Sequence, residues 1–235
     1  MEWKTNISKI TEDGVILRGE KLDQLMESKS FTEVIFLTLK GKLPSKNEKS
    51  MLDAILVSSI VHSIGVPSIT AARIIKSSGT PFSTAVAGGI LAIGENHGGA
   101  VEKCAKLLQS GKSAHAIVED SVKNKERIPG LGHKVYKDED PRTVKLFSLA
   151  EKLNIYGKSI DLLKKIEQEL ENVKGNKFPI NIDGAIAAII SDMGFSWEVA
   201  NAFFIIPRTV GICANVHEEC NGPLRRVNEE EIKYY

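Results

Sequence analysis

The chain has 235 residues and a formal net charge of +1 at pH 7; 42% of its residues are hydrophobic and 26% are charged. This composition is typical of a soluble globular protein, and it excludes collagen-like and strongly disordered classes. The near-zero charge gives no electrostatic reason to expect nucleic acid or a membrane surface as a partner.

Helical periodicity dominates the chain after an N-terminal hairpin, which we predict at Asp13-Gly14. Two capping boxes, Ser-x-x-Glu at 30–33 and 45–48, predict a helix to about residue 40 and another ending near 65–67. Further helices are predicted up to about residue 77 and over 81–93, 100–110, 113–126, 141–153, 158–173 and 185–193, and from Ser196 to about Cys220 with a start or kink at Pro207. The fold class is therefore all-α, with roughly ten to twelve helices.

The helix that follows Thr80-Pro81 is almost uncharged through Ile93. Threonine before proline is a cap-plus-proline pattern for a helix start. A helix that is apolar on all sides belongs in the middle of a fold or at an oligomer interface. This segment therefore indicates a homodimer, or a tetramer built from such dimers.

Cysteine usage and the N-terminus suggest a cytoplasmic protein. Cys104, Cys213 and Cys220 form no CxxC pair and are odd in number, which argues against a disulfide framework. The N-terminus lacks an apolar signal core, and we expect no apolar run of membrane-spanning length.

The segment 128–142 combines a glycine-rich turn with a helix start. Gly130 and Gly132 follow Pro129 and suit a turn whose backbone approaches a ligand, with His133 at its tip. Asp140-Pro141 predicts a helix N-cap with Arg142 in the first helical turn. The alternative is that His133 is only a turn residue and Arg142 a solvated cation.

Other ionisable residues lie next to turns or helix ends, and each also has a purely structural interpretation. If they have no function, His62 is a buried or interface histidine, and His97, before Gly98-Gly99, is a turn residue. Asp183, if it has no function, is only a helix N-cap. Arg208 follows Pro207 and would neutralise a buried carboxylate, and Arg225-Arg226 would be a solvated tail.

Together these motifs resemble the citrate synthase family in order and in type. Gly132-His-Lys-Val-Tyr136 followed by Asp140-Pro-Arg142 is similar to its Gly-His-Arg-Val-Tyr…Asp-Pro-Arg signature, with Lys134 in place of arginine. Asn96-His-Gly-Gly-Ala100 and Phe178-Pro-Ile-Asn-Ile-Asp183 resemble its Leu-His-Gly-Gly-Ala and Tyr-Pro-Asn-Val-Asp motifs. Further similar stretches are Leu17-Arg-Gly-Glu, Ser30-Phe-Thr-Glu-Val-Ile, Gly41-Lys-Leu-Pro44, His62…Ala72-Arg73, Arg208-Thr-Val-Gly211 and Pro223-Leu-Arg-Arg226.

The resemblance implies one citrate synthase-like domain over residues 1–235, a large helical domain with a smaller helical subdomain at roughly 100–205. Only seventeen residues separate Pro44 from His62, whereas citrate synthases have a long block of helices there. This shortening, and Gly184 after Asp183, look more like the short citryl-CoA lyases and the citryl-CoA lyase module of ATP-citrate lyase. That module carries phenylalanine at the position of His97.

The resemblance also implies roles for these residues in cleaving citryl-CoA to acetyl-CoA and oxaloacetate. His133 takes the hydroxyl proton, His97 donates a hydrogen bond to the thioester oxygen, and Asp183 delivers a proton to the enol carbon. The substrate carboxylates would be bound by His62, Arg142 and Arg208 and by one of Arg225 and Arg226, the C-terminal arginine reaching into the neighbouring subunit.

For coenzyme A, which is part of the substrate, the resemblance implies the backbone of Leu131 and Gly132 and phosphate contacts from Lys134, Lys137 and Lys177. No tightly bound cofactor and no metal site are expected, since the sequence has no Walker or dinucleotide glycine motif. A citryl-CoA synthetase would be a partner that supplies the substrate.

Two alternatives remain open at the level of sequence. A minimal citrate synthase would use the same residues to condense acetyl-CoA with oxaloacetate, because one site catalyses both directions. A non-catalytic CoA-binding paralogue ranks last, because His97, His133 and Asp183 are all present.

Overall fold

Eleven α-helices make up most of the computed structural model, which describes residues 2–234. Its mostly helical architecture confirms the predicted fold class. In chain order the elements are β1 (Ser8–Thr11), β2 (Gly14–Leu17), β3 (Glu20–Lys21), α1 (Leu22–Ser28), α2 (Phe31–Lys40), α3 (Lys46–Ser59), α4 (Pro67–Ser77), α5 (Phe82–Leu91), α6 (Ala100–Leu108), α7 (Ala114–Asn124), α8 (Pro141–Lys152), α9 (Lys158–Lys174), α10 (Ile182–Asp192), α11 (Ala202–Glu218) and the short 3-10 helices η1 (Trp197–Val199), η2 (Glu219–Asn221) and η3 (Glu229–Glu231).

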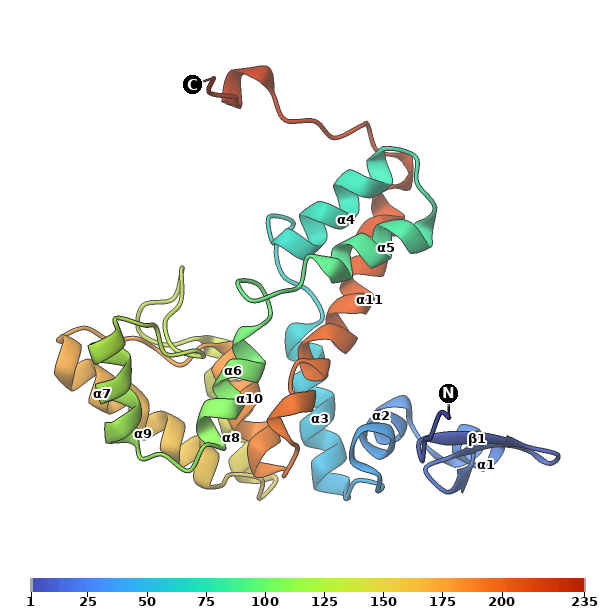
Figure 1. Ribbon diagram of the computed structural model, residues 1–235, viewed down its shortest axis with the longest axis horizontal. Helices are drawn as coiled ribbons and strands as arrows, with labels where there is room; N and C mark the ends of the chain where they lie inside the picture. The colour runs from blue at the N-terminus through green and yellow to red at the C-terminus, as the bar shows by residue number, and fades with distance from the viewer. Residues whose placement is uncertain (1, 235) are drawn as a thin grey trace.

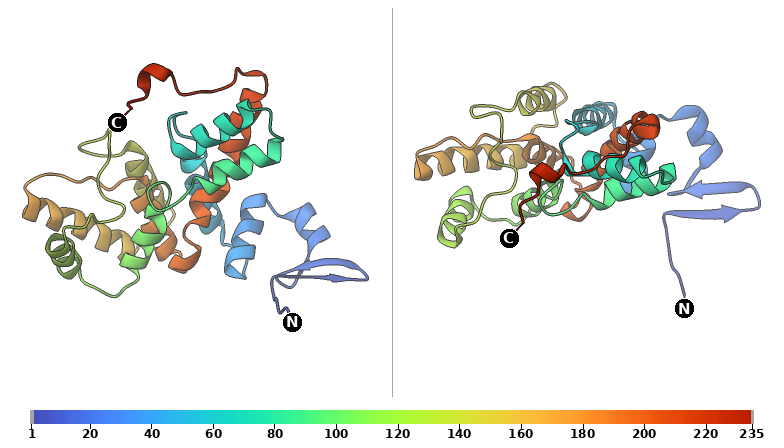
Figure 2. Two further views of the ribbon diagram at one scale, coloured as in Figure 1. Left: turned by 45° about the horizontal axis from the view of Figure 1, so that its top comes forward. Right: turned by 90° about the horizontal axis from the view of Figure 1, so that it is seen from above.

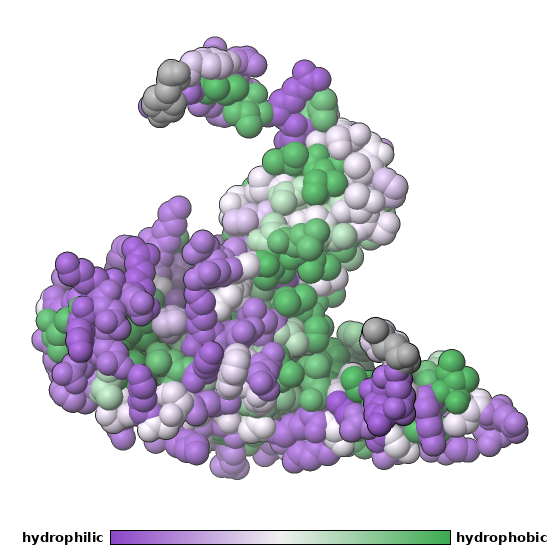
Figure 3. Space-filling model, viewed as in Figure 1, coloured by the Kyte–Doolittle hydropathy of each residue, from purple (hydrophilic) through white to green (hydrophobic). Residues whose placement is uncertain are grey.

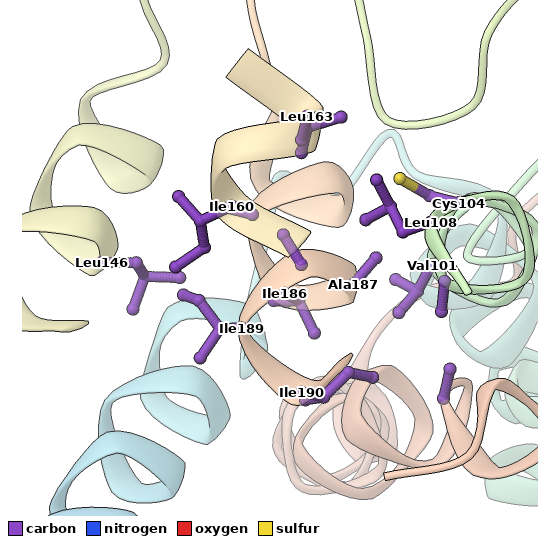
Figure 4. Packing of buried hydrophobic residues seen from close by; sticks show 14 of the residues in the cluster. Val101, Cys104, Leu108, Leu146, Ile160, Leu163, Ile186, Ala187, Ile189 and Ile190 are labelled. Carbon is purple, nitrogen blue, oxygen red and sulfur yellow. The ribbon is translucent and has the colours of Figure 1, made fainter. Parts of the chain in front are cut away.

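Helix α10 is the centre of the larger core. Every residue from Gly184 to Ile190 is buried, which the small and branched apolar side chains of this segment allow. Figure 4 shows Ile186 and Ile189 between α3, α8 and α9, while Ala187 faces Val101 and Cys104 of α6. Asp183, in the first turn of α10, therefore directly precedes the buried part of this helix.

A second group of helices stands apart from this core. Helices α4 and α5 pack against the C-terminal half of α11 around a small cluster that includes Ile69, Ala72 and Ile212. In Figure 1 these helices form the upper part of the molecule, and α6 to α10 lie to the lower left. Helix α11 runs between the two groups, and the active-site candidates lie where they meet.

The two ends of the chain extend away from the helices (Figure 2). Strands β1 and β2 form the predicted hairpin, in which Thr11 pairs with Gly14. Strand β3 and helix α1 were not predicted, because a strand of two residues and a helix of seven are too short to show a period in the sequence. The C-terminal segment beyond η2 is exposed.

Local capping signals set most helix starts as predicted. The Ser30 hydroxyl accepts a hydrogen bond from the Glu33 amide, and the Glu33 carboxylate accepts one from the Ser30 amide; Ser45 and Glu48 form the same pair of bonds. The predicted end of the second helix was wrong: α3 stops at Ser59, not near Gly65-Pro67. His62 consequently lies in a loop.

Two other helix starts also differ from the prediction. The hydroxyl of Thr80 donates to the carbonyl of Ile75, so it does not cap α5, which begins at Phe82. Helix α10 begins at Ile182 and not at Ala185, and Asn181 is its N-cap. The structural alternative for Asp183, a helix cap, is therefore wrong.

The helical region Trp197–Asn221 has 25 residues and, judged by length and composition alone, is long and apolar enough to cross a membrane. The expectation that no segment reaches this length was therefore wrong. Pro207 lies inside α11 and not at its start. The helix packs against α3, α4 and α5, and it buries Phe203, Arg208 and Ile212. A core helix of a soluble protein passes the same length test.

Candidate active site

A pocket of about 390 Å³ brings together six of the residues predicted from the sequence to have catalytic or carboxylate-binding roles, from stretches far apart in the chain. They are His62, His97, His133, Arg142, Asp183 and Arg208. The pocket lies between the group of helices around α10 and the group formed by α4, α5 and α11. Three imidazoles, one carboxyl group and two guanidinium groups therefore line one cavity.

The turn that carries His133 is held by its backbone. Gly130 and Gly132 have φ angles of 86° and 83°, in the left-handed region that glycine adopts without strain. The Nδ1 atom of His133 accepts hydrogen bonds from the amides of Val135 and Tyr136, both at 3.0 Å. Because two donors converge on Nδ1, the proton of the neutral ring lies on Nε2.

Arg142 is oriented by the residue that caps its own helix. The buried Asp140 caps α8 by accepting from the Arg142 amide at 3.0 Å, and its other oxygen accepts from the guanidinium at 2.7 Å. Burial alone would raise the pKa of Asp140, but the hydrogen bonds from Arg142 outweigh it and lower that pKa. The same guanidinium nitrogen, Nη2, lies 3.5 Å from Nε2 of His133, and Arg142 lines the pocket.

His97 is fixed between a hydroxyl group and an aromatic ring. Its Nε2 lies 2.8 Å from Oγ of the fully buried Ser68, and its ring meets that of Phe204 edge-on. Burial, and then the charge of Arg208, lower the pKa of His97, so its neutral form predominates at neutral pH. With Ser68 on Nε2, the other ring nitrogen remains to contact a ligand.

Asp183 and Arg208 both line the pocket, where Asp183 is half-buried and Arg208 is buried. Burial raises the pKa of Asp183, while the nearby Arg142 and Arg208 act in the opposite direction. Arg208 is only 3% exposed. It donates to the Ser59 carbonyl at 3.2 Å and stacks over the Phe204 ring. A carboxyl group with a raised pKa can deliver a proton, and a guanidinium can bind a carboxylate beside it.

A second pocket, of about 740 Å³, adjoins the first and shares the turn Gly132–Lys134 with it. All the residues assigned to coenzyme A line this second pocket: Leu131, Gly132, Lys134, Lys137 and Lys177. Lys125, Arg127 and Lys174 line it as well. They were not predicted, because nothing in the local sequence distinguishes a lysine or arginine that binds a ligand from one that is only solvated. The only acid among the lining residues is Glu126, so the pocket suits a phosphorylated ligand.

The two C-terminal arginines do not reach the pocket of their own chain. Arg225 is bound to the buried carboxylate of Glu219, and Arg226 is exposed.

His62 is exposed on the pocket rim, where its Nδ1 accepts from the amide of Ser63. Partial desolvation by the neighbouring pocket wall, and then the charge of Arg142, lower the pKa of His62.

Three residues that support the site were not singled out from the sequence. Ser68 and Phe204 lie within helices, where nothing local distinguishes them from other helical residues. Asn181 could have been found, because an asparagine two residues before Asp183 fits an N-cap.

Several proteins of known structure or activity are similar to this chain. The structure matches that of a citryl-CoA lyase from Hydrogenobacter thermophilus with a TM-score of 0.94 and 41% identity, covering 99% of this chain and 94% of that one. It also matches the fold of an ATP citrate lyase from Methanothrix soehngenii, with a TM-score of 0.86, 24% identity and coverage of 100% and 42%.

Among curated proteins, a citrate synthase from Heyndrickxia coagulans is 29% identical over 87% of this chain and 56% of its own length. The chain thus spans about half the length of that synthase. The family model for the C-terminal domain of citrate synthase matches residues 46–227. The chain therefore belongs to the citrate synthase family.

Proposed function

We propose that this protein cleaves citryl-CoA to acetyl-CoA and oxaloacetate. One observation carries the proposal: a pocket of acid–base groups and arginines shares the His133 turn with a larger, lysine-rich pocket. A substrate that joins a carboxylate-rich acid to a phosphorylated nucleotide through a thioester fits this pair of pockets. Its scissile bond would then lie near the shared turn.

Cleavage requires two proton transfers and the movement of one electron pair. The tertiary hydroxyl gives its proton to a base, for which His133 is the proposed group, the carbon–carbon bond breaks, and the electrons of that bond pass to the thioester enolate. The methylene of that enolate then takes a proton and becomes the methyl group of acetyl-CoA. Asp183 suits the last step, since burial raises its pKa and favours the protonated acid that this step consumes.

His97 suits the stabilisation of the enolate oxygen. With Nε2 on the Ser68 hydroxyl, a neutral ring has Nδ1 free to donate a hydrogen bond to the thioester oxygen. A neutral donor avoids placing a second full charge beside Arg208. The fixed position of His97 between Ser68 and Phe204 means that little reorganisation accompanies the reaction.

The role of His133 depends on its tautomer. Uptake of the hydroxyl proton at Nε2 needs a lone pair there, but the Val135 and Tyr136 amides favour a lone pair on Nδ1. In this geometry Nε2–H donates to the citryl oxygen. His133 can accept the hydroxyl proton at Nε2 only after the turn releases Nδ1. Arg142, next to Nε2, would bind a carboxylate on the same carbon.

Condensation of acetyl-CoA with oxaloacetate, the citrate synthase reaction, is the second candidate. The synthase names among the curated relatives favour it. Similarity to the Hydrogenobacter lyase, with 41% identity and a TM-score of 0.94, favours the lyase. A CoA-binding protein without activity fits less well, since His97, His133 and Asp183 face one pocket.

The test is to mix the purified chain with citryl-CoA and, separately, with acetyl-CoA plus oxaloacetate. We expect rapid release of oxaloacetate from citryl-CoA and negligible net formation of citrate from the second mixture. Efficient release of free citrate and coenzyme A from the second mixture would identify a synthase. No turnover in either mixture would indicate a CoA-binding protein without catalytic activity.

We also propose that the active form is a two-fold homodimer, alone or within a tetramer, that joins through α5 and its neighbours. Only Ala85 and Gly89 of the nearly uncharged α5 are buried, and Leu91 is 84% exposed. Apolar side chains gather along the middle of the face in Figure 3, where α3, α5 and α11 lie. Val57 and Val210 add exposed apolar surface on α3 and α11.

Citryl-CoA must be made before it can be cleaved. Its thioester requires an activated citrate, which none of the groups in this pocket supplies. We therefore propose that a separate citryl-CoA synthetase provides the substrate in the cytoplasm.

A further inference from the structure

We propose that Asn181 is a positioning residue that keeps His133 and Asp183 in a fixed relation to each other. The inference rests on the proposed function for its catalytic consequence, but its structural part can be tested on the free protein. Within residues 2–234, no hydrogen bond joins the side chains of His133 and Asp183. Their relative position must therefore be set by the segments that carry them.

The side chain of Asn181 bonds to both segments at once. Its Oδ1 accepts from the amides of Asp183 and Gly184, each at 3.1 Å, and so caps α10. Its Nδ2 donates to the carbonyl of Gly132 at 2.8 Å, directly before His133. One amide group therefore links the first turn of α10 to the histidine turn.

The backbone beside Asn181 repeats this connection. Its own amide donates to the Gly130 carbonyl at 3.0 Å, and the Gly132 amide donates to the Pro179 carbonyl at 2.8 Å. Gly130 and Gly184 are in direct backbone contact, and a Cβ atom on Gly184 would overlap the Gly130 carbonyl. The two segments are so close that a small shift of one moves the other.

Only a side chain with a donor and an acceptor on a short arm can make both contacts. Serine is an equally good N-cap, but its hydroxyl cannot cap α10 and also reach Gly132. Asn181→Ser therefore separates the two roles: it keeps the cap and removes the link to the histidine turn. Asn181→Ala removes both.

The consequence for catalysis follows from alignment. The proton donor and the group that holds the citryl oxygen must act on one substrate, and a misplacement of about 1 Å can cost about 10²-fold in rate. Substrate affinity depends on the guanidinium groups and the lysine side chains, with which Asn181 forms no hydrogen bond within residues 2–234. Loss of the link should therefore reduce kcat and leave KM nearly unchanged.

The experiment compares Asn181→Ser, Asn181→Ala and a matched control, Asn47→Ser. Asn47 also donates from Nδ2 to a distant backbone carbonyl, that of Leu153 at 2.9 Å, but far from the pocket. Hydrogen–deuterium exchange is measured on the free proteins over residues 130–137, together with Tm, and kcat and KM are measured with citryl-CoA.

We expect exchange over residues 130–137 to rise about tenfold in both Asn181 variants and not in the control, because each loses one tertiary hydrogen bond to the turn. Only Asn181→Ala should also have a lower Tm, because it loses the cap of α10 as well. For Asn181→Ser, kcat should fall about 10²-fold with KM within about threefold. Unchanged exchange in Asn181→Ser, or a normal kcat despite faster exchange, would overturn the proposal. If the unaltered protein does not cleave citryl-CoA, the proposed function fails, and the exchange result alone decides whether Asn181 holds the turn.

Discussion

The guanidinium of Arg225 donates two hydrogen bonds to the buried carboxylate of Glu219, at 2.7 Å and 3.1 Å. Arg73 of α4 pairs with the same carboxylate. Together the two arginines lower the pKa of Glu219, with the Arg225 hydrogen bond as the largest cause. Arg225 therefore anchors the C-terminal segment, and we propose that Arg226, which makes no polar contact within residues 2–234, is the arginine that binds a ligand.

This arrangement predicts different effects for the two arginines. Arg226→Ala should lower kcat/KM about 10²-fold or more with an unchanged Tm, because a guanidinium that binds a carboxylate is lost. Arg225→Ala should reduce Tm, because Glu219 loses one of its two charged partners. Steady-state kinetics and thermal unfolding distinguish the two. An equal loss of kcat/KM in both variants would contradict the anchoring role of Arg225.

A site shared between subunits can be tested by mixing Arg226→Ala with Asp183→Asn, two variants expected to be inactive. A mixed dimer holds one site with its own Asp183 and its neighbour's Arg226, so subunit exchange should restore part of the activity. No recovery after proven exchange, or a fully active monomer by light scattering, would refute the shared site.

Asp183→Asn should lower turnover about 10²-fold or more, because the amide cannot deliver a proton. The same change should not destabilise the protein. Burial raises the pKa of Asp183 above its usual 3.8, so the folded state binds more protons than the unfolded state above that pH, and stability falls as pH rises through this window.

Asn cannot ionise, so Asp183→Asn should unfold at an equal or higher Tm than the unaltered protein at pH 7. The difference should disappear below the ordinary pKa of aspartate. Thermal unfolding across this pH range is the measurement. A lower Tm at pH 7 would mean that the charge of Asp183 supports the fold through Arg142 and Arg208.

His133→Ala should abolish cleavage, a loss of about 10²-fold to 10⁴-fold, and leave the affinity for coenzyme A within about threefold. The second pocket is formed by the backbone of the turn and by lysines, and not mainly by the imidazole. His133→Asn is the control for turn structure, since its Oδ1 can accept the bonds that Nδ1 receives from Val135 and Tyr136. Calorimetric titration with coenzyme A separates binding from catalysis, and normal cleavage by either variant would remove His133 from the mechanism.

Ser68→Ala should reduce kcat about tenfold with little change in KM, because His97 loses the partner that orients its ring. Ser110→Ala, which removes an exposed hydroxyl bound to the Leu107 carbonyl, is the matched control. If Ser68→Ala and Ser110→Ala have the same kcat, the contact between Ser68 and His97 has no catalytic role.

Lys134→Ala combined with Lys177→Ala should weaken coenzyme A binding about tenfold or more and reduce its salt dependence, because both residues line the second pocket. Lys145→Ala, on the exposed side of α8, changes the net charge without touching either pocket. Titrations at low and high salt compare these variants. Equal affinities in the double variant and the unaltered protein would exclude this pocket as the phosphate site.

The sequence by itself determined the helical class and most helix starts. Capping boxes at Ser30 and Ser45 and the Asp140-Pro141 pair act within four residues of the chain, so short-range chemistry is enough to predict them. The same holds for the glycines of the histidine turn, whose positive φ angles depend on residue type.

Only the tertiary structure decided which of the conspicuous residues share a pocket and what holds them there. His97 comes from the loop before α6, His133 from the turn before α8 and Asp183 from α10; their proximity depends on packing between helices far apart in the sequence. The pairing of Arg225 with Glu219, the Ser68 contact to His97 and the two-sided bonding of Asn181 have no local signature. Each is a hydrogen bond to a group that periodicity and capping rules do not place in space.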